Sequence, residues 1–410
     1  MAVDRTLHAS EEALQIRRQV ALLTAGKDKP YALGMASALL AKNVSFDFIG
    51  SELVDGPELH ADPRVRVLIL RDQRADATAS QKVLRVLAYY YRLLRYTGRA
   101  EAKVFHILWN NKFEFFDRTL MMAYYKMMHK RIVLTVHNVN IGKRDSSDSY
   151  LNRLSLRIQY ALSDRIFVHT ARMRSDLMSE FGVPSAKISV IPFGINNTVP
   201  NTNLSTAEAK RQLGVRSSEK TLLFFGNIAP YKGLEYLITA FTKIAKEDQS
   251  YRLIIAGRPK GADDYWNRIR EAITNRGVSD RIIQKIEYIP DEETELYFKA
   301  ADVLILPYTQ IFQSGVLFLG YAFGLPVIAA DVGSLKDEII ENETGFVFLR
   351  GNSSDLANQI RRYFSSSLFL ELENRRARIK TFANDRYSWA KVAEIVTRAY
   401  SDLLAEGTSQ

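Results

Sequence analysis

The chain has 410 residues, enough for two domains of ordinary size, and its 47% apolar and 25% charged residues are typical of a globular protein. Cysteine is absent, which excludes disulfides and thiolate metal sites, and the six histidines lack metal-binding spacing. The net charge of +10 would suit nucleic acid, acidic substrates, an anionic membrane or simply a solvated surface. Since no nucleic-acid-binding motif accompanies the charge, we expect no nucleic-acid partner.

The first half alternates short apolar runs with amphipathic stretches, which is the pattern of parallel β-α units. We expect strands at 20–24, 44–49, 65–70, 103–109, 132–136, 165–169 and 188–191, and helices at 31–42, 80–96, 150–162 and 171–181.

Two helical stretches of this half mix aromatic residues and methionine with lysine and arginine. The first carries Tyr89, Tyr90, Tyr91 and Tyr96 among Arg85, Arg92, Arg95 and Arg99, and the second runs from Met121 to Arg131. Rings at the head-group level with cations on anionic lipid are typical of a membrane-surface contact. Core aromatics beneath solvated cations are the alternative, and both interpretations stay open.

His137 directly follows the strand at 132–136, at the carboxyl end of a parallel strand. A histidine there can hydrogen-bond a sugar hydroxyl or take up a proton, although a structural histidine satisfied by the loop backbone is the alternative. Asp145 and Asp148, on the next loop, are either general-base candidates or carboxylates at a helix start.

Residues 196–205 are polar and lack apolar periodicity, so we place a linker and the domain boundary there. The αβ rhythm then restarts. We expect strands at 222–225, 251–256, 282–288, 303–306 and 327–330, and helices at 234–245, 266–276, 292–300 and 315–323.

Two loops at strand ends of this half have the composition of a phosphate site. Lys232 lies just past the strand at 222–225, near two glycines, and its ammonium can neutralise a phosphate; an exposed lysine in a turn is the alternative. The loop Gln313-Ser314-Gly315 follows the strand at 303–306 and opens a helix, so its N–H groups and the helix dipole favour an anion. We interpret this loop as holding the diphosphate of a nucleotide sugar.

Several of these motifs resemble a known family. The stretches FGNIAPYKGLEYLITAF, LIIAG, ADVLILPY, SGVLFLGYAFGLPVIAADVGS and NETGFVF are together similar to the nucleotide-binding domain of GT-B glycosyltransferases, most closely the retaining enzymes of family 4, also called "glycosyltransferase group 1". The first half is similar to the same class through VHNVN, FVHT and FGVPSAKISVIPFGINN.

The resemblance implies an α/β GT-B fold with two Rossmann-like domains facing each other across a cleft. Residues 1–195 would bind the acceptor, residues 196–385 would bind the nucleotide sugar, and the helix in 386–410 would pack back on the first domain. It also implies retaining transfer from a nucleotide-sugar donor to a glycan or lipid-linked acceptor in polysaccharide synthesis, with no cofactor and no required metal ion.

Carried onto this sequence, the resemblance makes Lys232 the phosphate-binding lysine, flanked by the family's glycines at Gly226 and Gly233. It makes Ser314 and Gly315 the loop whose amides meet the diphosphate, and His137 the histidine near the transferred sugar. Asp337 falls near the family's acid after the last glycine turn. Lys232 and His137 are therefore the expected catalytic residues.

Two departures from the family pattern affect the donor site. Asn227 stands where the family commonly has an arginine, and Ile311 and Leu319 stand where it has two glutamates. Arg258 could supply the missing positive charge, and Gln310 or Gln313 the missing polar contacts. An inactive GT-B binding or scaffold subunit is therefore the main alternative, and a GT-B epimerase acting on the nucleotide sugar is a weaker one.

The stretch before residue 18 has no apolar core of the signal-peptide type, and the longest apolar run, 316–330, is broken by glycines and a proline. We therefore expect a cytoplasmic protein, either free or peripheral on the inner face of the cell membrane, in contact with anionic lipid.

Overall fold

The computed structural model describes residues 18–72, 78–140, 142, 148–195 and 199–406. The chain forms two compact units, one comprising the residues up to Gly194 together with those from Trp389 onward, and the other running from Ile195 to Ser388. Each unit is described by itself.

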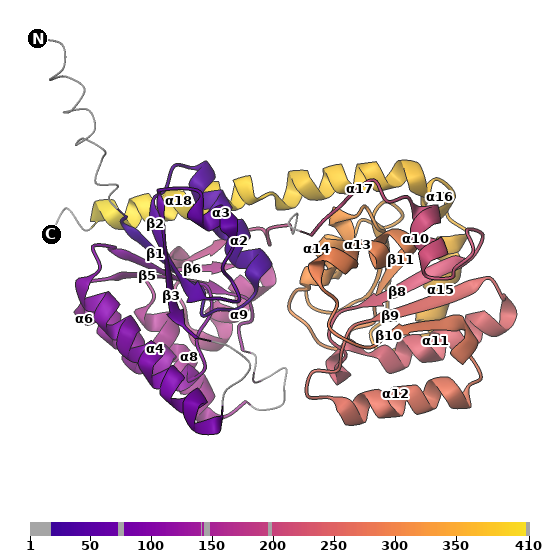
Figure 1. Ribbon diagram of the computed structural model, residues 1–410, viewed down its shortest axis with the longest axis horizontal. Coiled ribbons are helices and arrows are strands. Elements are labelled where there is room, and N and C mark those ends of the chain that lie inside the picture. Colours follow the sequence, from indigo (N-terminus) through magenta and orange to yellow (C-terminus); the bar gives the residue numbers. More distant parts are fainter. Residues whose placement is uncertain (1–17, 73–77, 141, 143–147, 196–198, 407–410) are drawn as a thin grey trace, which may run out of the picture. The chain divides into compact units, whose positions relative to one another are not determined.

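The first unit is built on a parallel sheet with the strand order β3-β2-β1-β4-β5-β6-β7 (Figure 1). Its strands are β1 (Val20–Leu23), β2 (Phe46–Ser51), β3 (Val65–Arg71), β4 (Val104–Ile107), β5 (Arg131–Val136), β6 (Arg165–Val168) and β7 (Ile188–Val190). The strand order reverses between β1 and β4, and loops at the carboxyl ends on either side of such a switch point commonly bind ligands.

Helices cover both faces of this sheet. They are α2 (Lys29–Ala41), α3 (Pro57–His60), α4 (Ala79–Arg99), α5 (Glu114–Phe116), η1 (Asp117–Met121), α6 (Met122–Met127), α8 (Tyr150–Leu162), α9 (Ala171–Phe181), η2 (Ser185–Lys187) and α18 (Trp389–Glu406). The expected strands and the helices at 31–42, 80–96, 150–162 and 171–181 are confirmed, with ends that shift by a few residues.

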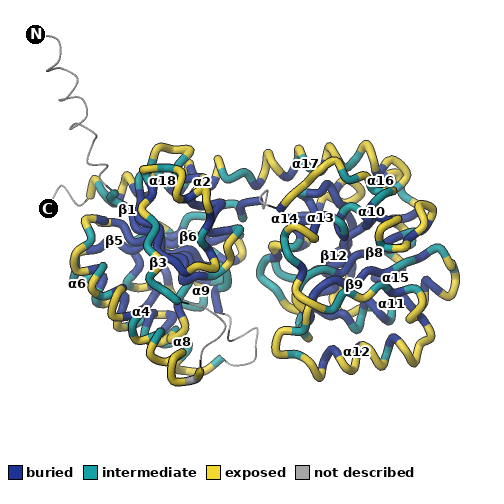
Figure 2. The backbone as a smooth tube through the Cα atoms, viewed as in Figure 1, coloured by how far each residue is buried: buried dark blue, intermediate teal, exposed yellow. Residues whose placement is uncertain are grey.

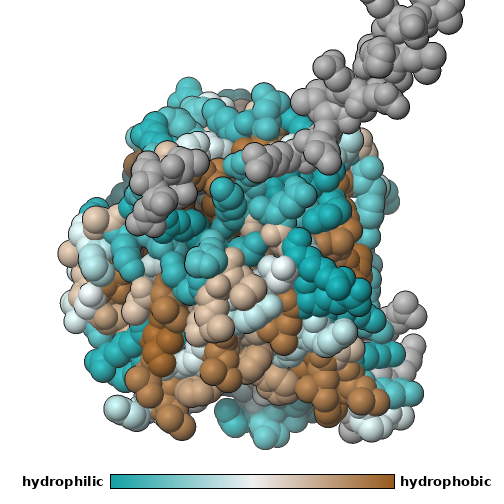
Figure 3. Space-filling view, turned by 90° about the vertical axis from the view of Figure 1, so that its left-hand side faces the viewer, coloured by the Kyte–Doolittle hydropathy of each residue, from teal (hydrophilic) through white to brown (hydrophobic). Residues whose placement is uncertain are grey.

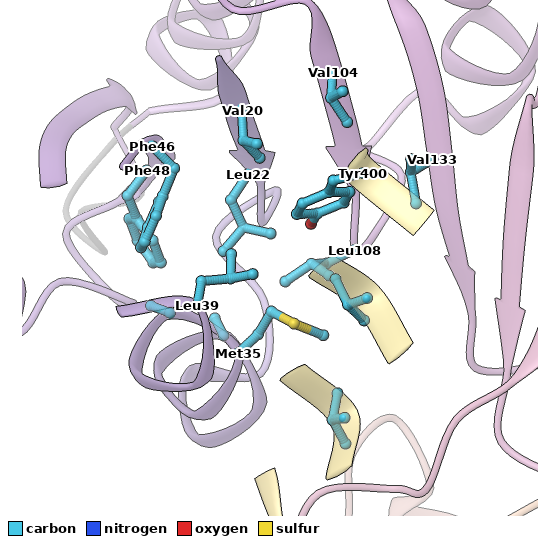
Figure 4. Close-up of a cluster of buried hydrophobic side chains, with 14 of the residues drawn as sticks. Val20, Leu22, Met35, Leu39, Phe46, Phe48, Val104, Leu108, Val133 and Tyr400 are labelled. Atoms are coloured by element: carbon cyan, nitrogen blue, oxygen red, sulfur yellow. The ribbon is translucent and has the colours of Figure 1, made fainter. Parts of the chain in front are cut away.

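The C-terminal helix α18 packs beside α2 on the first sheet, which confirms the expected return of the chain to the first domain (Figure 1). Its Val392, Val396 and Tyr400 belong to the core formed by α2 and one face of the sheet. Figure 4 shows Tyr400 within this cluster. Trp389 is seated between two glycines, since a Cβ at Gly34 or Gly194 would lie 2.2 Å from the indole. Small residues at these two positions therefore let α18 begin where it does.

The opposite face of the sheet carries α4, whose tyrosines differ in how far they are buried. Figure 2 shows buried and exposed residues interleaved along α4. Tyr89 and Tyr90 are buried, whereas Tyr91 is 64% exposed. In the following segment Met121 is buried and Met127 is exposed. The core interpretation therefore holds for the buried side chains, because the turn of α4 directs residues 89 and 90 toward the protein interior. The membrane interpretation stays open for the exposed ones.

The second unit has a parallel sheet with the equivalent order β10-β9-β8-β11-β12-β13 (Figure 1). Its strands are β8 (Lys220–Phe225), β9 (Tyr251–Ala256), β10 (Ile282–Lys285), β11 (Val303–Leu306), β12 (Val327–Ala330) and β13 (Gly345–Phe348). Its helices are α10 (Thr206–Gln212), η3 (Pro230–Lys232), α11 (Leu234–Glu247), α12 (Asp263–Asn275), η4 (Ser279–Arg281), α13 (Asp291–Ala300), α14 (Gly315–Ala322), η5 (Lys336–Glu338), α15 (Ser353–Phe364), α16 (Ser367–Leu370) and α17 (Leu372–Tyr387). The expected strands are again present, but β10 ends before the predicted residue 288.

The predicted linker, 196–205, is only partly a linker. Residues 196–198 lie outside the described residues. After them, Val199 is buried, and the Thr202 N–H and hydroxyl both donate to the Glu295 carboxylate on α13. The division into units falls between Gly194 and Ile195, next to the predicted boundary, but the polar composition gave no sign of these bonds to a neighbouring helix.

Candidate active site

The second sheet reverses its strand order between β8 and β11, and the loops that leave these two strands are bonded together. The Thr309 N–H donates to the Tyr231 carbonyl over 2.9 Å. Gly233 adopts a φ of +64°, and a Cβ there would lie 2.1 Å from the Pro307 carbonyl oxygen. The parallel topology thus brings the two predicted phosphate loops side by side.

Lys232 lies at the centre of this junction and is buried. Its Nζ donates to the Tyr308 hydroxyl over 2.7 Å and lies 4.3 Å from the centre of that ring. The alternative of an exposed lysine in a turn is therefore wrong. A lysine held in one place by a tyrosine presents its charge at a fixed position, which is what stabilising a developing negative charge requires.

Tyr308 is a site residue that the sequence did not reveal. It is fully buried, and burial is the main cause that raises the pKa of its hydroxyl, so it stays protonated at neutral pH. The Ser314 hydroxyl donates to it over 3.4 Å. Tyr308 thus connects Lys232 on one loop with Ser314 on the other, and its only sequence signal was its position after Pro307 at a strand end.

Ser314 and Gly315 open α14 as predicted. Ser314 precedes the helix but makes no side-chain capping bond, because its hydroxyl is directed to Tyr308. The first N–H groups of a helix have no carbonyl partner within it, and the helix dipole adds partial positive charge there. Ser314 is buried and Gly315 is exposed, so the amides at this end of α14 are positioned to meet an anion.

Glycine is required where the loop after β8 meets the loop after the neighbouring strand β9. Gly226 has a φ of +97° and its N–H donates to the Ala256 carbonyl. A Cβ at Gly257 would lie 1.9 Å from the Gly226 carbonyl oxygen, so the β8 and β9 loops touch through backbone alone. Gly257 is therefore a second residue of the site that sequence reasoning did not single out.

The other predicted donor-site residues surround these loops. Asn227 is exposed, while Gln313 is half-buried before α14. Arg258 is exposed after β9, with its guanidinium 5.2 Å from the centre of the Tyr288 ring. Leu319 is buried on α14, so this position offers no polar contact. Their roles in donor binding stay predictions.

The family resemblance places an acid near Asp337, but the buried carboxylate in this segment is the next residue, Glu338. Asp337 is exposed, whereas Glu338 is buried and bonds to the Tyr387 hydroxyl. Burial is the main cause that raises the pKa of Glu338. Glu338 thus ties η5 to the end of α17.

His137 belongs to the first unit, where it lines a cavity of about 140 Å³ at the carboxyl ends of β4 and β5. Its ring stacks on Trp109 at 4.4 Å with the planes 3° apart, and Tyr31 meets it edge-on. Its Nδ1 shares a 3.2 Å hydrogen bond with His169 Nε2. Trp109, Tyr31 and His169 come from different β-α units, and for that reason no local motif predicted them.

Burial lowers the pKa of His137 well below its ordinary value, and lowers the pKa of His169 to about 4. Both rings are therefore neutral at physiological pH. A neutral imidazole can donate or accept a hydrogen bond, but it does not supply a proton as an imidazolium would. This environment favours the hydrogen-bonding role of His137 over the proton-transfer role.

Of the two loop carboxylates, Asp145 lies outside the described residues. Asp148 accepts hydrogen bonds from Asn152 and Arg153 in the first turn of α8. Its surroundings match the helix-start interpretation rather than the general-base one.

Within the described residues, no cluster of histidine and carboxylate side chains has the arrangement of a metal site. In the same part of the chain, every helix is too short or too polar to cross a bilayer.

Two family models cover most of the chain. Residues 205–386 match the model "Glycosyl transferases group 1", and residues 30–198 match "Glycosyltransferase Family 4". The model "Glycosyl transferases group 1" thus coincides with the second unit, Ile195–Ser388. The model "Glycosyltransferase Family 4" coincides with most of the first unit.

Curated relatives and solved structures agree with these models. A D-inositol 3-phosphate glycosyltransferase of Corynebacterium aurimucosum is 28% identical over 66% of this chain and 64% of its own length. An uncharacterized glycosyltransferase of Methanocaldococcus jannaschii is 27% identical over 65% of this chain and 68% of its own. The chain thus spans about two thirds of the length of these relatives.

Among solved structures, sucrose-phosphate synthase from Thermosynechococcus elongatus has a TM-score of 0.74 at 19% identity, covering 95% of this chain and all of its own. HepE of Anabaena, solved with UDP and glucose, has a TM-score of 0.73 at 16% identity, covering 94% of this chain and 99% of its own. These likenesses show the GT-B fold. The two family models, which together match residues 30–198 and 205–386, show that the chain belongs to the family 4 glycosyltransferases.

Proposed function

We propose that this protein transfers a sugar from a nucleotide-sugar donor to a glycan or lipid-linked acceptor, with retention of configuration at the anomeric carbon. The observation that carries the proposal is the junction of Lys232, Tyr308 and Ser314 at the switch point of the second sheet. That the HepE structures hold UDP or UDP-glucose supports a uridine donor as the first compound to test.

In the proposed reaction, the bond between the anomeric carbon and the diphosphate oxygen breaks as the acceptor oxygen bonds to the same face of that carbon. Lys232 and the amides at the start of α14 stabilise the charge on the departing diphosphate. The acceptor proton passes to the departing phosphate oxygen. We assign no side chain as the general base. The positive charge comes from the lysine and the amide dipoles, so the proposal requires no metal ion.

His137 is proposed to hydrogen-bond a hydroxyl of the transferred sugar. Its neutral ring and the cavity beside it, which Lys27, Asn110 and Gln159 also line, suit a polyhydroxylated ligand. We propose that the pathway is the synthesis of a cell-surface or exported polysaccharide, and that the protein works at the inner face of the cell membrane.

Calorimetry with a panel of nucleoside diphosphates, followed by a donor screen scored by release of nucleoside diphosphate, tests this function. We expect saturable binding of one diphosphate per chain and turnover of the matching nucleotide sugar in the presence of acceptor. A scaffold subunit that has lost its chemistry should bind none of them. Binding without transfer to any acceptor, together with interconversion of the sugar, would instead indicate the epimerase.

Replacing Tyr308 with phenylalanine should lower kcat/KM by about tenfold to a hundredfold, because hydrogen bonds to charged groups contribute about 1.5–3 kcal/mol. The ring stays in place and only the hydroxyl that positions Lys232 is lost. Tyr363→Phe is the matched control: its buried hydroxyl donates to the Asp302 carbonyl at the other end of β11. We expect that control to lose stability but retain kcat/KM. Equal activity of Tyr308→Phe and the wild type would remove Tyr308 from the site.

A further inference from the structure

We propose that a groove between α4 and the edge strand β3 binds the phosphate groups of anionic lipids and seats the first unit on a membrane. This inference rests on the proposed location of the protein at the inner face of the cell membrane. It concerns a surface that the proposed sugar transfer does not use.

Four arginines line the groove, which has a volume of about 330 Å³. Arg66 lies on β3, Arg92, Arg95 and Arg99 lie on α4, and Leu68 and Leu70 form part of the lining.

Among the described residues, one carboxylate is bonded to this set. Asp47 accepts bonds from Arg66 and from the Tyr96 hydroxyl. Four guanidinium groups and one carboxylate leave three positive charges in the groove.

The arginines are gathered there by the helix and by the position of the strand. Residues 92, 95 and 99 follow the i, i+3, i+7 spacing that places side chains on one side of a helix. Because β3 is the edge strand of the sheet, no further strand covers that side. Arg92 donates to the Leu70 carbonyl over 3.3 Å, while the described residues offer Arg95 and Arg99 no hydrogen-bond or ion-pair partner.

Nearer its N-terminus, the same helix exposes apolar side chains. Leu84, Leu87 and Tyr91 are 65%, 56% and 64% exposed and share the same i, i+3, i+7 spacing. Arg95 comes one turn after Tyr91, so the exposed apolar side chains are directly followed by the arginines. The distance along the helix from Leu84 to Arg95 is roughly 16 Å. Figure 3 shows apolar side chains gathered on the lower part of the face that it draws.

An anionic bilayer suits this surface better than a nucleic acid does. Guanidinium groups bind phosphate through paired N–H groups, and apolar side chains of an interfacial helix enter the boundary between head groups and acyl chains. A nucleic acid would satisfy the arginines but would leave Leu84 and Leu87 in water. The two halves of the α4 surface together match a lipid, which has a phosphate and an acyl chain in one molecule.

Flotation of the full chain with vesicles tests the proposal. We expect the wild type to float with vesicles of equal parts phosphatidylcholine and phosphatidylglycerol, to float less as salt is added, and to remain behind with phosphatidylcholine alone. Arg95→Glu with Arg99→Glu should weaken the binding at least 25-fold, since each basic residue near an anionic surface contributes roughly fivefold. Leu84→Ser with Leu87→Ser should weaken it without removing its salt dependence.

The matched control is Arg268→Glu with Arg270→Glu, which changes the net charge equally on an exposed helix of the second unit, α12. It should leave flotation unchanged. A wild type that does not float, or a control as weak as the groove variant, would overturn the proposal. Failure to float combined with retention of a labelled RNA oligonucleotide by the same arginines would assign the groove to nucleic acid instead. Release of nucleoside diphosphate with a soluble acceptor, unchanged in the groove variant, separates this inference from the proposed transfer.

Discussion

Lys232→Ala is expected to lower kcat by about a hundredfold to a thousandfold, the usual effect of removing one preorganised group that stabilises developing charge. Lys232 is buried, its Nζ lies 2.7 Å from the Tyr308 hydroxyl, and the start of α14 is next to it through Ser314. Without the ammonium, the departing diphosphate would lose the one buried positive charge that this junction holds in place. Donor binding should weaken less than turnover, because the charge to be stabilised grows as the bond breaks.

The measurement is kcat and KM for the donor that the screen identifies, with the folding of the variant checked by its thermal unfolding. Lys246→Ala, at an exposed position on α11 of the same unit, is the matched control and should keep full activity. A Lys232→Ala variant that turns over like the wild type, with an intact fold, would remove the central element of the proposed mechanism. A variant that raises KM for the donor but keeps the wild-type kcat would assign the lysine to ground-state binding alone.

Much of this site could be predicted because parallel sheets leave strong local signals. Strands that are covered on both faces are continuous apolar runs, and β9, β11 and β12 begin and end at the predicted residues. The alternation of strands and helices then indicates a parallel order, which brings all strand ends with their loops to one edge. The sequence alone therefore predicts that Lys232 and Ser314 lie near each other.

What could not be predicted depends on which way a side chain points across a loop or around a helix. Tyr308 follows a strand and a proline, and nothing local indicates that its hydroxyl meets Lys232. On α4 the sequence shows aromatic and basic residues on several sides, and only packing decides that Tyr89 is buried and Tyr91 exposed. The helix α10 was missed because it is short and mostly polar.

The second large expected effect is a loss of stability when the buried lysine of α10 is replaced. Lys210 on α10 is buried, and its Nζ lies 2.9 Å from the Asp302 carboxylate at the start of β11. It also donates to the Glu219 carbonyl over 2.8 Å, while the Thr221 N–H donates to Asp302 over 2.7 Å. Lys210→Met should lower the free energy of unfolding of the second unit by about 3–5 kcal/mol, because it leaves a buried carboxylate without its cation.

Chemical denaturation, combined with hydrogen exchange of the β8 and β11 amides, measures this loss. Lys220→Met is the matched control, since Lys220 pairs with Asp248 at the surface, where such pairs contribute about 0–1 kcal/mol. An equally small loss in both variants would mean that the buried pair is not what fixes α10 to the sheet.

The pH dependence of the Lys210→Met variant provides a further check. Burial already raises the pKa of Asp302, and Lys210 opposes that rise. Removing the lysine should raise this pKa further in the folded state, so the folded variant binds the proton more tightly than the unfolded chain does. Stability relative to wild type should therefore fall as pH rises from about 4, the ordinary carboxylate value, toward the raised pKa. The destabilisation should be smallest in acid, and a loss that stays constant between acid and neutral pH would show that Asp302 is not the group left unpaired.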